Sequence, residues 1–299
     1  MAPEVGSLER GVLALDVGGT KIAAGEVTRQ GRILRRQVVA NPRPSNGDDL
    51  FQSVVDLLSR FAPFDDYLGL GVGCGGPMTL GGTHVSPINI PAWRQFPLHQ
   101  RLSEHCQLPL AIDNDAKALA LAEGWVGAAV GYQSYIAMVV STGVGGGIVL
   151  NGRLLHGDAG NAGHIGHVMV CPDSLVAPPQ HVPGMLESEA SGTGIQLRIG
   201  APAVDASTAD IRRTGMLVGR AVASVANLLD LRLAVVAGSV ALGYGEPFFS
   251  SAQAEMDRLC VLDHSRGARI RPAGLGADGP LVGAAAVVLR HLGLLPRSF

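Results

Sequence analysis

The sequence predicts an α/β protein made of two related lobes, and three observations support this prediction. Short apolar strands alternate with helices along the chain. The first strand, at 11–17, ends in a glycine turn, and two more strands follow it at 21–27 and 32–40. The same order of strand, glycine turn, strand and strand restarts at 135–155, which indicates a duplicated unit. A chain of 299 residues is long enough for two lobes with separate cores.

Periodicity predicts the other elements of the first half. After turn-forming residues at 45–47, residues 48–61 carry apolar side chains at helical spacing and predict a helix. Residues 68–74 are apolar and predict a buried strand. Residues 109–116 predict a strand that ends in acidic residues, and 116–129 predict the helix that follows it.

The second half continues the alternation of strand and helix. An Asn-Gly turn at 151–152 joins the last two strands of the repeated pattern. Residues 210–230 predict a long amphipathic helix, and 232–240 a strand that ends in a turn of small residues. Residues 279–292 predict a closing helix, whereas four prolines make 171–184 an irregular loop.

Composition and charge exclude several classes of function. The formal net charge is -2, so nothing attracts the chain generally to nucleic acid or to an anionic membrane. The first ten residues lack the apolar core of a secretory signal, and the longest apolar run, 281–289, is too short to span a bilayer. The four cysteines form no Cys-x-x-Cys pair, so neither a disulfide framework nor a zinc knuckle is indicated. We expect a cytoplasmic protein without nucleic-acid or membrane partners.

The first glycine turn has the composition of an anion site. Asp16 ends a strand, and Gly18 and Gly19 allow backbone N–H groups to approach an anion closely. Thr20 and Lys21 add side-chain donors. An ordinary Gly-Gly hairpin is the alternative interpretation. The order of residues is not that of a Walker A loop.

A second glycine turn, at 141–149, has four glycines in five positions between apolar strands. Thr142, Gly143 and Gly145 belong to this turn, which suits a phosphate cradle. A glycine-rich hairpin without a ligand is the alternative. Two such turns, one in each lobe, could hold one polyphosphate together.

Polar residues follow the strand at 109–116, where strand passes into helix. Asn114 and Asp115 lie at this junction. In one interpretation Asp115 contacts a substrate hydroxyl, and in the other Asp113 or Asn114 only caps the helix.

Two histidines, His164 and His167, lie three positions apart in a glycine-rich stretch. Their spacing alone is compatible with a metal site, a substrate site or a solvated loop.

Taken together, these stretches resemble the ROK family of bacterial sugar kinases and repressors, and the resemblance covers nearly the whole chain. The family opens with an Asp-x-Gly-Gly-Thr-Lys turn, here 16–21, and has an NDAN-like catalytic stretch, here 114–117. Further matches are Asn89 and Trp93 in "NIPAW", the turn at 142–147, Gly238-Ser239 as a looser adenosine-side match, and "GADGPLVGAA" at 276–285.

The resemblance implies an actin-like (ribonuclease H-like) fold with two α/β lobes and a central cleft. We place the first lobe at 1–115 and the second at 116–299, with the final helix, about 280–293, packing back on the first lobe. The family's reaction uses ATP and Mg²⁺ and transfers phosphate to a sugar hydroxyl, usually at C6. Its members are often dimers, so a homodimer is expected.

The resemblance also implies roles for individual residues. Asp115 is the general base, and Asp16 is the carboxylate near Mg²⁺. The sugar ligands are Gly76, Asn89, Asn114, Asp115, His164, His167 and Glu187. The ATP-binding residues are Asp16, Gly18, Gly19, Thr20, Lys21, Thr142, Gly143, Gly145 and Gly238.

Two departures from the family pattern bear on metal and substrate. The family's structural zinc is held by a histidine at the position of His167 and by cysteines whose positions here are Pro178, Gln180 and Met185. Proline and methionine cannot replace thiolates, so no structural zinc is expected. His164 stands where the family has a glutamate that contacts sugar hydroxyls. This change favours a modified glucose, such as the amino sugar kanosamine that ROK members of antibiotic pathways phosphorylate.

The alternatives to an amino-sugar kinase are a plain glucokinase and a non-catalytic sugar sensor. A ROK repressor needs a helix-turn-helix module before the kinase-like part, and the first core strand here begins at about residue 11. Asp115 and both glycine turns favour an enzyme over a sensor.

Overall fold

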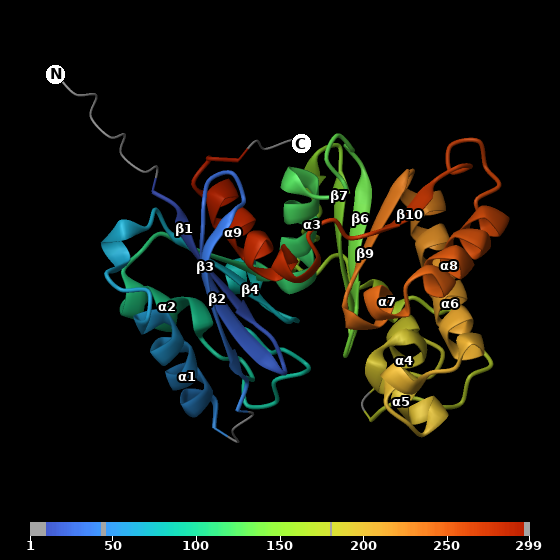
Figure 1. Cartoon of the computed structure of the whole chain (residues 1–299), viewed down its shortest axis with the longest axis horizontal. Coiled ribbons are helices and arrows are strands. Elements are labelled where there is room, and N and C mark those ends of the chain that lie inside the picture. The colour runs from blue at the N-terminus through green and yellow to red at the C-terminus, as the bar shows by residue number, and fades with distance from the viewer. Residues whose placement is uncertain (1–9, 43–45, 180, 296–299) are drawn as a thin grey trace. The chain divides into compact units, whose positions relative to one another are not determined.

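The computed structural model describes residues 10–42, 46–179 and 181–295 (Figure 1). The chain forms two compact units. The described part of the first unit comprises 10–42, 46–122, 157–161 and 277–295, and that of the second comprises 123–156, 162–179 and 181–276. The first unit thus continues past residue 115, through most of the helix that begins there.

The first unit is built on a five-stranded sheet in the order β3-β2-β1-β4-β5. Its strands are β1 (Val12–Val17), β2 (Lys21–Val27), β3 (Ile33–Ala40), β4 (Leu70–Cys74) and β5 (Leu110–Asn114). The first three strands pair antiparallel, whereas β1, β4 and β5 pair parallel. β1 and β4 are buried along their whole length, as apolar strands covered on both faces are.

The second unit repeats this plan with a sheet in the order β10-β9-β6-β7-β8. Its strands are β6 (Tyr135–Val140), β7 (Val144–Leu150), β8 (Arg153–Leu154), β9 (Leu233–Ala237) and β10 (Arg269–Pro272). Three consecutive strands are again antiparallel, and two later strands join parallel beside the first of them. The duplication predicted from the sequence is therefore confirmed in the topology.

Helices α1 (Gly47–Ser59), α2 (Leu98–Cys106), α3 (Asp115–Val126) and α9 (Gly279–His291) accompany the first sheet. In α1 the buried residues recur at helical spacing, and the Asn46 side chain caps the helix by accepting from Asp48 N. α9 packs against β1 and β4. It comes so close that a Cβ on Gly71 would lie 1.9 Å from the carbonyl oxygen of Ala284.

The second unit contains α4 (Leu186–Ala190), α5 (Gly192–Ile199), α6 (Thr208–Leu229), α7 (Ser239–Tyr244) and α8 (Glu246–Leu259). A capping box between Ser207 and Asp210 starts α6. α6 packs on α8, and Gly215 and Gly219 leave room for the α8 backbone.

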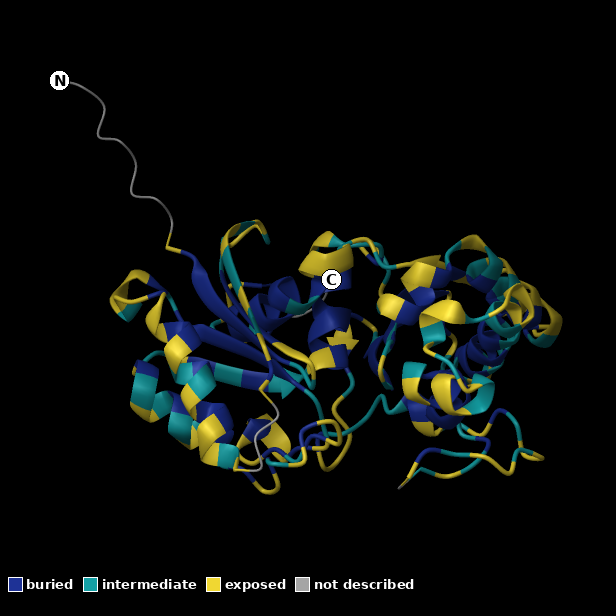
Figure 2. Cartoon of the chain, turned by 60° about the horizontal axis from the view of Figure 1, so that its bottom comes forward, coloured by how far each residue is buried: buried dark blue, intermediate teal, exposed yellow. Residues whose placement is uncertain are grey.

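Burial follows the two sheets. The central strands are buried, and the exposed residues gather on outer helix faces and in loops (Figure 2). The four cysteines, all in the described part of the chain, form no disulfide in the structure. Within the described part of the chain, no helix is both long and apolar enough to cross a membrane.

Candidate active site

The turn after β1 is held in place by backbone and side-chain bonds. Gly18 N donates to the carbonyl oxygen of Lys21 (3.0 Å), and Asn41 Nδ2 donates to the carbonyl oxygen of Gly18 (2.8 Å). A Cβ on Gly19 would lie 2.9 Å from Cβ and O of Asn89. The structure thus brings the glycine turn against Asn89, two motifs about seventy residues apart in the sequence.

Asp16 and Asp115 both approach the side of Gly73, in β4, to which a side chain at that position would point. A Cβ on Gly73 would be 3.6 Å from Asp16 Oδ1 and 3.7 Å from the Cα of Asp115. Asp16 lies in β1, and Asp115 directly follows β5. β1, β4 and β5 are parallel neighbours, and their carboxyl ends meet at one edge of the sheet. In open α/β sheets this edge is the usual place for a ligand.

The junction between β5 and α3 is also the cap of the helix. Asn114 Oδ1 accepts from Ala116 N (3.0 Å), and Asp115 Oδ1 accepts from the same nitrogen (2.8 Å). The capping interpretation of Asn114 therefore holds for its carbonyl oxygen. Its amide nitrogen is not part of the cap and is the group that can donate to a ligand.

Burial and like charge set the electrostatics of this edge. Burial, with repulsion from Asp115, raises the pKa of Asp16 from 3.8 to about 7, although Lys21 acts in the opposite direction. Burial is also the main reason that the pKa of the Cys74 thiol lies well above its ordinary value, and Asp115 and Asp16 add to it. A cation placed here would relieve the repulsion between the carboxylates.

Lys117 has a role that the sequence did not indicate. Its side chain is only 2% exposed, and its Nζ lies 2.8 Å from Asp113 Oδ1 and 3.0 Å from the carbonyl oxygen of Gly160. The Asp113 carboxylate also accepts from Asn114 N (2.8 Å). The lysine thus fastens the 157–161 segment to the start of the helix that carries Asp115.

In the second unit, the turn after β6 meets two other segments. Gly192 N donates to the carbonyl oxygen of Ser141 (2.7 Å), and Thr193 Oγ1 donates to the carbonyl oxygen of Thr142 (3.1 Å). The Ser141 and Ser239 hydroxyls lie 3.0 Å apart. The structure therefore brings the 142–145 turn together with the turn that contains Gly238.

Gly238 and Gly145 occupy different positions around this turn. Gly238 has a φ of 102°, and a Cβ on it would lie 2.3 Å from the carbonyl oxygen of Val140, so only glycine fits. Gly145 lies within β7.

Glu187 and the two histidines gather around β7 in the same unit. Glu187, at the start of α4, is 8% exposed and accepts from Val144 N (3.3 Å). A Cβ on Gly166 would lie 2.4 Å from the carbonyl oxygen of Val144 and 3.1 Å from Glu187 Cβ. The rings of His164 and His167 meet edge to face, 5.9 Å apart.

The loop at 169–185 is closed by backbone bonds. Val170 N and Cys171 N both donate to the carbonyl oxygen of Gly184 (2.9 and 3.0 Å). Met185, at one of the family's cysteine positions, pairs with Met169 in an isolated bridge. Pro178 lies in the loop, and Gln180 falls outside the described residues. No group of three His, Cys, Asp or Glu side chains in the described ranges could hold a metal ion.

His181 is a further residue that the sequence did not single out for the site. Its Nε2 lies 3.9 Å from Glu187 Oε2, and its Nδ1 lies 3.0 Å from the carbonyl oxygen of Pro179.

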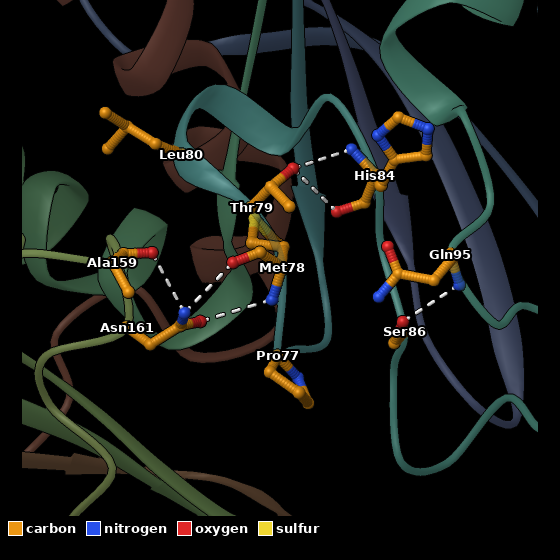
Figure 3. A pocket seen from close by; sticks show the side chains of 9 residues that line it. All are labelled: Pro77, Met78, Thr79, Leu80, His84, Ser86, Gln95, Ala159 and Asn161. Atoms are coloured by element: carbon orange, nitrogen blue, oxygen red, sulfur yellow. Dashed lines mark hydrogen bonds between the residues drawn. The ribbon is translucent and has the colours of Figure 1, made fainter.

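A pocket of about 390 Å³ lies in the first unit, beside Gly76 (Figure 3). It is lined by Pro77, Met78, Thr79, Leu80, His84, Ser86, Gln95, Ala159 and Asn161. The Asn161 side chain spans the backbone N and O of Met78 (3.1 and 3.0 Å), as the dashed lines show. Neither Asp16 nor Asp115 lines this pocket, so it is not the place of the carboxylate chemistry.

Comparison with known proteins agrees with this geometry. The ROK family model matches residues 12–291. The chain is 30% identical to a glucokinase of Halalkalibacterium halodurans, over 92% of this chain and 94% of that protein. It is 32% identical to an N-acetylmannosamine kinase of Pasteurella multocida, over 91% and 94% of the two chains.

Among solved structures, a ROK family glucokinase from Streptomyces griseus, in complex with glucose and AMPPNP, matches with a TM-score of 0.77. It is 28% identical, and the match covers 92% of this chain and 98% of that one. With the matched sheets and the family model in agreement, the chain belongs to the ROK family and has the actin-like fold of its sugar kinases.

Proposed function

We propose that the chain is an ATP-dependent hexose kinase that transfers the γ-phosphoryl group of ATP to the 6-hydroxyl of a glucose-like sugar. The observation that carries the proposal is the approach of Asp16 and Asp115 to the same side of Gly73. A glucokinase and an N-acetylmannosamine kinase among the relatives support it, as does the AMPPNP complex of the Streptomyces griseus protein.

Asp115 is the proposed general base. As the sugar oxygen bonds to the γ-phosphorus, the bond from phosphorus to the ADP oxygen breaks, and the hydroxyl proton moves to the Asp115 carboxylate. Because the transition state of phosphoryl transfer is loose, this proton leaves late, and Asp115 needs no strong basicity. Most of the rate then comes from positioning the reactants and stabilising charge. Asn114, Asn89 and Gly76 are the residues proposed to orient the sugar toward the phosphoryl group.

Asp16 is the proposed ligand of Mg²⁺, directly or through water. Mg²⁺ is commonly held by one or two carboxylates together with water and substrate phosphates, and a single buried carboxylate beside a second one fits that pattern. When bound, the ion would neutralise phosphate charge. Because the pKa of Asp16 is raised to about 7 by burial and by Asp115, the cation would also favour its ionised form.

The glycine turns are the proposed phosphate and nucleotide contacts. Backbone N–H groups of such turns bind anions without the bulk of side chains. In the first unit these are Gly18, Gly19, Thr20 and Lys21, and in the second they are Thr142, Gly143, Gly145 and Gly238.

The proposed sugar is an amino- or deoxy-glucose. An ionised carboxylate only accepts hydrogen bonds and can hold two adjacent hydroxyls, whereas a neutral imidazole has one donor and one acceptor on opposite sides of its ring. His164 in place of the family's glutamate therefore weakens the grip on a diol and removes a negative charge. His167 and Glu187 are the proposed partners of the remaining sugar hydroxyls. Glucose and N-acetylmannosamine are the competing substrates, and the relatives favour both.

An assay of ADP formation over a sugar panel tests the proposed function. The panel contains glucose, kanosamine, 2-deoxyglucose and N-acetylmannosamine, with 6-deoxyglucose as the control that lacks the accepting hydroxyl. We expect turnover with at least one panel sugar and none with 6-deoxyglucose. Sugar binding by calorimetry without ADP formation would replace the kinase with a sugar sensor.

The choice of sugar is tested at His164. We expect the wild type to prefer kanosamine over glucose in kcat/KM, and His164→Glu to move the preference toward glucose. The physical reason is the restored bidentate acceptor for adjacent hydroxyls. The measurement is kcat/KM for both sugars in both proteins, and an unchanged ratio would remove His164 from specificity.

A further inference from the structure

Glu123 is a fully buried carboxylate to which the proposed reaction gives no role. It is 0% exposed and lies in the later part of α3, the helix that begins with Asp115. Its Oε2 accepts from Ala128 N (2.7 Å) and Gly274 N (3.0 Å), and its Oε1 accepts from Leu275 N (3.2 Å). An ionised carboxylate only accepts hydrogen bonds, so these three donors match its chemistry.

The donors lie where the chain passes between the two units. The chain leaves the first unit after Ala122, returns to it briefly at 157–161, and enters it for the last time between Gly276 and Ala277. Gly274 and Leu275 directly precede this last entry. The Glu123 carboxylate therefore ties together two passages that are about 150 residues apart in the sequence.

The surrounding backbone is shaped to this carboxylate. A Cβ on Gly127 would lie 2.2 Å from Glu123 Oε2, and a Cβ on Gly274 would lie 2.9 Å from Ala128 N. Side chains at these two positions would displace the carboxylate or its donors. The glycines thus keep open the space in which the three N–H groups converge.

We propose that Glu123 is a positioning residue that makes these two passages a single hinge and holds α3, with Asp115, in its working orientation. Hinges in enzymes consist of a few residues at element ends, away from the chemistry. The two helices next to the hinge are themselves packed together, since a Cβ on Gly283 of α9 would lie 2.8 Å from the carbonyl carbon of Ala118 in α3. The inference rests on the proposed function for what the hinge positions, whereas the hinge contacts stand without it.

The test compares Glu123→Gln with Glu104→Gln, the same change at an exposed position of α2. Glutamine has nearly the same size but presents an NH₂ group to backbone N–H donors, so at least one of the three bonds is lost. We expect amide hydrogen exchange in peptides covering 127–129 and 273–276 to become about tenfold faster, as for the loss of a buried hydrogen bond. We also expect kcat and the KM for sugar to change together, as hinge variants do. Glu104→Gln should match the wild type in both measurements.

Each result bears on a different part of the inference. Unchanged amide exchange at 273–276 would show that the Glu123 carboxylate does not hold this passage. Faster exchange with unchanged kcat and KM, measured well below the thermal midpoint, would overturn the positioning role. Absence of phosphorylation by the wild type would instead contradict the proposed function, and the exchange experiment needs no turnover. If the glutamine variant does not fold, Glu123→Asp takes its place with the same expectations, because its shorter carboxylate cannot reach both passages.

Discussion

Asp115 and Asp16 share one edge of the first sheet, but their surroundings differ. Asp115 starts a helix and has one oxygen at the helix N-terminus, accepting from Ala116 N. Its negative charge is favoured there by the helix dipole. Asp16 ends a buried strand and is 8% exposed, with a raised pKa. These surroundings are compatible with the proposed roles of Asp115 as the proton acceptor and of Asp16 as the ligand of a cation.

Replacing Asp115 with asparagine removes the proposed base and keeps the size of the side chain. We expect turnover to fall by roughly 10² to 10⁴, the usual contribution of a positioned general base. Circular dichroism and the thermal midpoint should show a folded protein. Asp65→Asn, at an exposed position, is the control and should keep full activity. Near-normal turnover of a folded Asp115→Asn protein would remove Asp115 from the mechanism.

Asp16 should make the stability of the cation-free protein depend on pH. The unfolded chain loses this proton near the ordinary pKa of 3.8, and the folded protein loses it near 7. The folded state therefore binds the extra proton between these values, and the free energy of unfolding falls as pH rises through this window. This decrease in the free energy of unfolding is on the order of a few kcal/mol. Because asparagine cannot ionise, the Asp16→Asn variant should not show it.

The check is the thermal midpoint of Asp16→Asn and wild type without divalent cations across this window. The thermal midpoint of Asp16→Asn minus that of the wild type should increase between about pH 4 and about pH 7 and stay constant above this range. A difference that stays constant with pH would show that Asp16 titrates normally. Activity of the variant should fall even where its stability gains, as for many strained functional residues.

At the scale of elements, β4 and α9 pack so closely in the first unit that a glycine is needed between them. A Cβ on Gly71 would be 1.9 Å from the Ala284 carbonyl oxygen, and backbone cannot rotate away as a side chain can. We expect Gly71→Ala to lower the free energy of unfolding by about 1–3 kcal/mol or more, as overpacking does. Gly243→Ala, in α7 with nothing within 4 Å, should be neutral or stabilising. Urea unfolding measures both, and equal stabilities would contradict the tight packing.

The elements that the sequence predicted are those with strong local patterns. The strands of both repeats and the helices α1, α3, α6 and α9 follow from apolar periodicity and turn residues. α2, α4, α5, α7, α8 and β10 were not predicted. α4 is held by a long-range pair, Arg213 with Glu189 at 2.6 Å, which no local pattern shows. For α8 a local signal existed, since Gly245 and Pro247 mark its start.

The residues around the candidate site also divide into those that the sequence predicted and those that it did not. Glycine turns and acidic strand ends were readable because each motif is contiguous in the sequence. The buried pair of Lys117 with Asp113, the contact of His181 with Glu187 and the three donors of Glu123 were not predicted. Each depends on where a distant loop lies, as Gly160 does for Lys117. Burial of a lysine or a glutamate cannot be read from its spacing, because these residues are mostly exposed.

At the scale of the whole molecule, the repeated sheet explains why two glycine turns occupy corresponding places. Each turn joins the first two strands of its sheet, β1 to β2 and β6 to β7. Each unit then adds its own polar residues, acidic in the first and histidine-rich in the second. One duplicated scaffold thus supplies two glycine turns with different neighbours, which we propose as the anion sites.

The whole protein should fold and work without zinc. The two described positions of the family's cysteines are Pro178 and Met185, whose side chains are poor zinc ligands. Backbone bonds from Val170 and Cys171 to Gly184 close the loop, and Ser188 Oγ donates to the carbonyl oxygen of Val182 (2.7 Å). Dialysis against a chelator should therefore leave the thermal midpoint and the zinc-free kinase activity unchanged. About one tightly bound zinc per chain in elemental analysis, with a lower midpoint after its removal, would show that the loop needs the metal.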